Sequence, residues 1–165
     1  MKAPLLAVVA VLGAAVFLIP AVGLGNGDSR KVLEAKVLAP LAPPYVSRPG
    51  APVKIRDVPG AGAQWSIGNA EVDLRSDGHL EIEVHGLIVT PLGRNPLAQF
   101  GAIVSCQSVV NGAPGVINVP TAPFNTNGDP GDAMTETNVA LPMPCLAPIV
   151  FVTTPGGSWI AVTGR

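Results

Sequence analysis

The chain has 165 residues, of which 48% are hydrophobic and 13% charged, and its formal net charge is -1. This length suits one domain with a substantial core, and the 19 Gly and 18 Pro residues indicate many turns rather than disorder, given the hydrophobic content. Near-neutral charge and few aromatic residues argue against a nucleic-acid partner, because nothing would neutralise phosphates or stack on bases.

Residues 1–23 are typical of a secretory signal peptide. Lys2 supplies the basic start, a long apolar run follows, and Pro20 with small residues ends it. We predict cleavage after Gly23. The alternative is an uncleaved membrane anchor, because residues 3–24 are numerous enough to span a bilayer with some tilt. The sequence therefore predicts a secreted or cell-envelope protein, with a membrane partner only if this segment is retained.

Residues 24–52 form a second, proline-rich segment. Proline lacks a backbone N–H and fixes one backbone torsion angle, so the proline spacing excludes a continuous helix and disfavours a central strand. We expect residues 24–52 to lie over the domain as extended chain, and residues 53–165 to form the folded domain.

From Val53 onward, short apolar or alternating runs are separated by turn residues. This spacing, with no stretch of helical period, predicts an all-β fold: a single-domain β-sandwich of about eight short strands, with a closed barrel as the alternative. The run 148–154 is apolar on both faces, which favours a place in the core. Charge is concentrated before residue 95. The later charged residues are only Asp129, Asp132, Glu136 and Arg165.

Cys106 and Cys145 are the only two cysteines of the chain. In an exported protein a single pair most simply forms one disulfide. Neither Gln107 nor Leu146 would activate a neighbouring thiol, so we predict a structural crosslink rather than a reactive cysteine.

The hairpin of residues 70–84 gives the sharpest local prediction. A three-residue turn closed by Gly78 pairs Leu74 with Leu80 and keeps the apolar side chains on one face. The other face then carries four carboxylates as two directly opposed pairs. These are Glu71, Asp73, Glu81 and Glu83.

Opposed like charges destabilise a sheet, so these carboxylates need compensation. We expect Lys54 and Arg56, at outward positions of a neighbouring strand, to neutralise them. The alternative is a bound Ca²⁺, which takes carboxylate ligands. His79 and His85 share this face but lie too far apart along one strand to bind the same metal, so we expect solvated histidines.

A second oxygen-rich segment imitates the spacing of a calcium-binding loop. Its candidate ligands are Asn125, Asn127, Asp129 and Asp132, with Glu136 at the twelfth place. Pro130 stands where such loops require Gly, and the flanking runs are strand-like rather than helical. We expect an ordinary turn here, with a calcium site as the alternative.

No common hydrolase motif is present, and we predict no catalytic residue. A triad of Ser76 or Ser105 with one of the histidines stays open, because triads assemble in space rather than in sequence. Trp65 and Trp159 would stack on sugar rings if they were exposed, although the alternation around Trp159 favours the core.

Five stretches carry a resemblance to known proteins: VPGAGAQW, HLEIEVHGLIV, VSCQSV, GDAMTE and LPMPCLAPIVFVTTPGGSWIAVTG. They cover most of residues 53–164 and resemble a group of secreted, mostly bacterial proteins with no assigned activity. The resemblance implies an exported single domain and no particular chemistry.

Together these patterns predict an exported, noncatalytic structural or binding module of the cell envelope or extracellular space. We expect no cofactor, with Ca²⁺ as the alternative. The sequence does not identify the partner, and a protein and a glycan are the two alternatives. The alternative functions are a calcium- or carbohydrate-binding module and a small secreted hydrolase.

Overall fold

The computed structural model describes residues 29–164, and all its regular elements are strands. The strands are β1 (Lys31–Ala35), β2 (Leu38–Pro40), β3 (Lys54–Ile55), β4 (Val58–Pro59), β5 (Trp65–Ser66), β6 (Asn69–Arg75), β7 (His79–His85), β8 (Ile88–Val89), β9 (Gln99–Val110), β10 (Ala113–Pro120), β11 (Phe124–Asn125), β12 (Ala133–Asn138), β13 (Leu146–Thr153) and β14 (Trp159–Thr163). The expected signal peptide lies outside the described residues. Within residues 29–164, no helix is long and apolar enough to cross a membrane.

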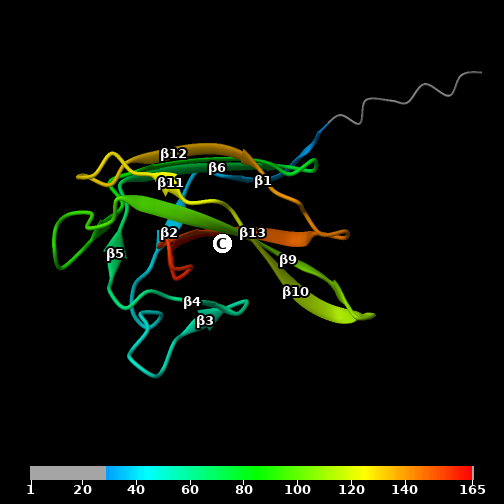
Figure 1. Ribbon diagram of the computed structural model, residues 1–165, viewed down its shortest axis with the longest axis horizontal. Helices are drawn as coiled ribbons and strands as arrows, with labels where there is room; N and C mark the ends of the chain where they lie inside the picture. The colour runs from blue at the N-terminus through cyan, green and yellow to red at the C-terminus, as the bar shows by residue number, and fades with distance from the viewer. Residues whose placement is uncertain (1–28, 165) are drawn as a thin grey trace, which may run out of the picture.

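Two open antiparallel sheets form the body of the protein (Figure 1). Sheet A has the order β1-β6-β7-β12, and sheet B has the order β10-β9-β13-β14-β2, with β11 beside β9. Neither sheet closes on itself, so the predicted all-β sandwich is confirmed and the barrel alternative is wrong. The core lies between the sheets, because the buried apolar side chains of β6 and β7 form one cluster with those of β9 and β13.

The hairpin β6–β7 has the predicted register, with Leu74 opposite Leu80. Gly78 has a φ of +92°, the left-handed region that the three-residue turn requires. The inward apolar side chains of the hairpin are at most 3% exposed. They are Ala70, Val72, Leu74, Leu80, Ile82 and Val84.

A third layer, residues 41–63, covers the outer face of sheet B and includes the small hairpin β3–β4 (Figure 1). Arg56 Nη1 donates to Ser105 O at 3.0 Å, and Asn118 Nδ2 donates to Arg56 O at 2.8 Å, so the β3–β4 hairpin lies against β9 and β10. Sheet B is therefore buried on both faces near its centre, and Val150, Phe151 and Val152 are 0% exposed. This confirms the core position predicted for the run 148–154, and the proline-rich chain covers the domain as expected.

The sandwich begins earlier in the chain than residue 53. Residues 31–40 were expected in the extended covering segment, but β1 is an edge strand of sheet A and β2 an edge strand of sheet B. Leu33 and Ala35 of β1 are half-buried while Glu34 is exposed, so this short run has strand alternation. Pro40 is tolerated because it lies on an edge strand, where a missing N–H costs little.

The predicted disulfide between Cys106 and Cys145 is present, with the two Cα atoms 4.9 Å apart. Cys106 lies in β9 and is 0% exposed. Cys145 directly precedes β13. The bond therefore ties the connection between β12 and β13 to the centre of sheet B.

Candidate functional site

The outward face of sheet A, here called the carboxylate face, carries a row of acidic residues across all four strands. Strand register places one carboxylate of each strand opposite the next. In order from β1 to β12, the row is Glu34, Asp73, Glu81 and Glu136. The sequence predicted only that Asp73 and Glu81 are opposite each other, because it did not predict which strands flank the hairpin.

A second pair, Glu71 opposite Glu83, lies one step further along the hairpin. Together with Asp73 and Glu81 it lines a small depression of about 170 Å³. The four carboxylates predicted on one face of the hairpin are therefore brought together. Directly opposed like charges are unfavourable in a sheet, so the neighbouring cations decide whether the arrangement is stable.

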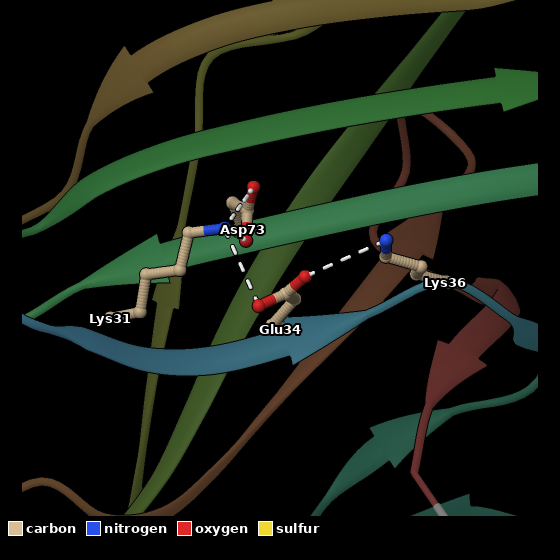
Figure 2. A network of polar contacts seen from close by, with 4 residues as sticks. All are labelled: Lys31, Glu34, Lys36 and Asp73. Atoms are coloured by element: carbon tan, nitrogen blue, oxygen red, sulfur yellow. Dashed lines mark hydrogen bonds and ion pairs between the residues drawn. The ribbon is translucent and has the colours of Figure 1, made fainter.

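Lys31 of β1 supplies the compensation at one end of this array. Its Nζ lies 2.9 Å from Asp73 Oδ1 and 3.4 Å from Glu34 Oε2, so one ammonium bridges two neighbouring acids of the row (Figure 2). Lys36 Nζ approaches the other Glu34 oxygen at 3.9 Å. The hydrogen bond to Asp73 raises the pKa of Lys31, and the two negative charges add to this effect.

Lys54 and Arg56 do not neutralise the carboxylates, so that prediction is wrong. The strand that holds Lys54 pairs only with β4, in the layer on the far side of sheet B. Arg56 Nη1 donates to Ser105 O at 3.0 Å and to Ala147 O at 2.8 Å. The physical reason is a tight turn: Arg56 and Asp57 both have positive φ, so VKIRDV folds back on itself instead of forming one long strand beside the hairpin.

Both histidines connect β7 to the segment at its other side. His85 Nε2 lies 2.8 Å from Glu83 Oε1, and Nδ1 lies 3.6 Å from Asp132 Oδ2. His79 Nε2 lies 3.4 Å from Glu136 Oε1. The hydrogen bond to Glu83 raises the pKa of His85, with Asp132 adding to the shift. The histidines are solvent-accessible, as expected, and each has acidic neighbours that the sequence did not reveal.

The oxygen-rich loop is held by hydrogen bonds within it and to neighbouring segments. Asp132 Oδ1 accepts from Gly86 N at 2.8 Å, and Asn127 N donates to Asp132 O at 2.8 Å. Asn125 Oδ1 accepts from Gln99 Nε2 at 3.0 Å. Local bonds such as Gly128 N to Thr126 Oγ1, at 3.2 Å, fit the expected turn, whereas the bonds to Gly86 and Gln99 tie the loop to distant parts of the chain.

Asn95 was missed by sequence reasoning although it holds the same loop. It is 7% exposed, and its Nδ2 donates to Leu97 O at 2.8 Å and to Gly128 O at 3.3 Å. Its Oδ1 accepts from Leu97 N at 2.9 Å. An Asn directly before Pro96 is the one local signal that could have indicated such a turn.

In the part of the chain from residue 29 to 164, no three His, Cys, Asp or Glu side chains are placed to hold a metal ion together. On a pleated sheet the carboxylates stand side by side instead of converging on one point. Asp129 is exposed in the loop, apart from the hairpin acids. Both calcium hypotheses stay predictions.

Both tryptophans are buried. Trp65 is 4% exposed and packs edge-to-face with Phe100, with ring centroids 6.3 Å apart. Trp159 is 2% exposed and lies between Tyr45 and Phe151. The core position predicted for Trp159 is confirmed, and the hypothesis that these indoles stack on sugar is wrong.

Within residues 29–164, neither serine considered for a catalytic triad makes a hydrogen bond to a histidine. Ser105 lies in sheet B and is 0% exposed, whereas both histidines lie on sheet A. Ser76 Oγ accepts from Arg30 N at 3.1 Å.

Comparisons of the chain with protein-family models, with curated proteins and with solved structures found no match.

Proposed function

We propose that the protein is an exported, noncatalytic structural or binding module of the cell envelope or extracellular space. The observation that carries this proposal is the disulfide between Cys106 and Cys145. Disulfides persist in oxidising compartments and are rare where thiols are kept reduced. The N-terminal sequence, with its basic start and long apolar run, supports the same location.

The exposure and ion pairing of the charged side chains on the carboxylate face support a noncatalytic role. The carboxylate face is an open sheet surface. Lys31 and the two histidines form ion pairs with its carboxylates. Catalytic acids and bases need a shielded environment, and an open, hydrated sheet face does not provide one.

Export can be tested on the full chain expressed in a bacterium with an oxidising periplasm. We expect the product in the periplasm or medium, with residues 1–23 removed and with a mass that shows no free thiol. A full-length cytosolic product with two free thiols would contradict the proposal.

Calcium binding is the second candidate, because four carboxylates line one depression, and it requires side-chain movement, since no three of the described acidic side chains converge on one point. Calorimetry with Ca²⁺ on the purified protein tests it directly. If the depression binds Ca²⁺, replacing Glu71 and Glu83 by Gln abolishes the heat of Ca²⁺ binding. Asp57 is an exposed carboxylate in another layer, so Asp57→Asn leaves that heat unchanged. No heat with the unmodified protein would end this candidate.

A further inference from the structure

The chain contains three Asn-Gly pairs, and the structure describes two of them, Asn111-Gly112 and Asn127-Gly128. The third pair, Asn26-Gly27, lies outside the described residues. Glycine has no Cβ, so the main-chain nitrogen that follows the asparagine approaches the side-chain amide with little hindrance. An Asn-Gly pair can therefore modify itself by losing ammonia, and the local structure decides whether it does.

Asn111-Gly112 forms the two-residue turn of the β9–β10 hairpin, because Val110 pairs with Ala113. Asn111 has a φ of +50° and Gly112 a φ of +80°, and a type I′ turn requires positive values at both positions. Both residues are exposed, and Figure 1 shows this hairpin projecting from the body of the sandwich. Within residues 29–164, Gly112 N has no backbone acceptor. The nitrogen that would attack is therefore free.

The main chain of Asn127-Gly128 is held by hydrogen bonds, although this pair is exposed too and Gly128 has a similar φ of +72°. Gly128 N donates to Thr126 Oγ1 at 3.2 Å, and Gly128 O accepts from Gly131 N at 2.6 Å. Asn127 N donates to Asp132 O at 2.8 Å. An attack on the side chain needs a free Gly128 nitrogen and a rotated main chain, so these bonds oppose the reaction.

The charge around the hairpin turn also permits the reaction. Residues 95–128 contain no charged residue, and Asn111 lies near the middle of this stretch. The attacking nitrogen must first lose its proton, and a carboxylate beside it would disfavour the resulting negative charge. Neither β9 nor β10 contains such a carboxylate.

We propose that Asn111 is a site of spontaneous deamidation in the folded protein, and that Asn127 is protected. After Gly112 N has lost its proton to a base, it attacks Asn111 Cγ. The new N–Cγ bond closes a succinimide ring, the Cγ–Nδ2 bond breaks, and ammonia leaves with a proton taken from water. Water then opens the ring. Nothing is oxidised or reduced, and water is the only co-reactant.

The two products change the hairpin turn in different ways. Opening the ring at Cγ leaves an aspartate, which is the first charge on this hairpin. Opening it at the main-chain carbonyl leaves an isoaspartate, in which the main chain runs through Cβ and Cγ. Turn length fixes strand register, so the longer turn disturbs the pairing of Val110 with Ala113 first. The reaction needs neither export nor a partner, so it is separate from the proposed function.

The test incubates the purified full chain, with its disulfide closed, in mildly alkaline buffer, both folded and unfolded in urea. Peptide mapping by mass spectrometry measures the loss of amide separately at Asn26, Asn111 and Asn127. An isoaspartyl methyltransferase reports the isoaspartate. Each folded rate is divided by the unfolded rate of the same site, so that effects of the neighbouring sequence cancel.

We expect folding to slow the reaction of Asn127 at least about tenfold more than that of Asn111, because its hydrogen bonds must open first. Thr126→Val removes the acceptor of Gly128 N, so it should speed the reaction at Asn127 and leave Asn111 unchanged. Asn111→Gly keeps a turn that accepts positive φ and should abolish the acidic species assigned to position 111. Far-UV circular dichroism verifies the fold of both variants.

Two results with the unmodified protein would overturn the proposal. In the first, folding slows Asn111 and Asn127 equally, so the hydrogen bonds of the second pair make no difference. In the second, Asn111 keeps its amide in the folded protein for as long as Asn127 does, so the hairpin turn is itself protective. A Thr126→Val variant that folds but shows no faster loss at Asn127 would contradict the role given to the bond from Gly128 N.

Discussion

Replacing Gly78 by Ala tests whether the close contact between the β6–β7 turn and Val139 stabilises the sandwich. Its φ of +92° lies in a region where a side chain costs about 1–3 kcal/mol. A Cβ at this position would also overlap the carbonyl oxygen of Val139. Val139 cannot move away without losing its N–H bond to Gly78 O at 2.9 Å, which is worth about 1 kcal/mol.

We therefore expect Gly78→Ala to lower the free energy of unfolding by about 2–4 kcal/mol, and Tm by roughly 5–15 °C. Urea and thermal unfolding followed by far-UV circular dichroism measure both quantities. Gly112→Ala is the matched control, because Gly112 has a φ of +80° but a Cβ added there would meet nothing within 4 Å. Gly112→Ala therefore has the cost of the positive φ but no clash with a neighbouring atom. Equal losses in the two variants would refute the assigned role of the Val139 contact.

Three further predictions concern the crosslink and the ion pairs. Reducing the disulfide, whose cysteines are 39 positions apart, should lower the free energy of unfolding by about 4 kcal/mol in the chain-entropy model, and a urea midpoint that does not move would contradict this. The pKa of His85 is raised in the folded state, so its contribution to stability is complete below its unfolded pKa and is lost as pH rises through the folded value. His85→Gln should therefore lower stability more at pH 5 than at pH 8, and a pH-independent loss would count against the pairs with Glu83 and Asp132. Lys31→Met should destabilise the protein more than Lys36→Met, and added salt should narrow this gap because it screens the exposed carboxylate row.

The hairpin register was predictable because it depends on neighbouring residues only. The turn contains Gly78, and the strict alternation of AEVDLR and HLEIEV leaves one pairing that keeps every apolar side chain on the same face. The disulfide was equally direct, because Cys106 and Cys145 had no competing partner. Both the hairpin register and the disulfide pairing therefore had only one arrangement compatible with the sequence.

The neighbours of the hairpin could not be predicted in the same way. Strand β1 contains only five residues and is followed closely by prolines, so its pairing with β6 depends on long-range packing and not on a local signal. The turn at Arg56 and Asp57 lacks the Gly or Asn that usually marks a two-residue turn. The sequence therefore suggested the wrong cations for the carboxylates.

The same limit explains the contacts of the histidines. His85 and Asp132 lie far apart in the chain and meet because β12 pairs with β7. A histidine and an aspartate so far apart in the sequence give no signal that they will be in contact. The burial of Trp159 was predictable from its apolar neighbours in SWIAVTG, whereas the packing of Tyr45 against it required the third layer.

The second strand of the sandwich depends on the last one. Strand β2, at residues 38–40, completes sheet B by pairing with β14, at residues 159–163. Contacts between such distant parts of a chain form slowly, because a large loop must close before the pairing is rewarded. During synthesis, sheet B cannot be finished until strand β14 has been made. The edge of sheet B therefore forms late, whereas sheet A contains no strand beyond residue 138.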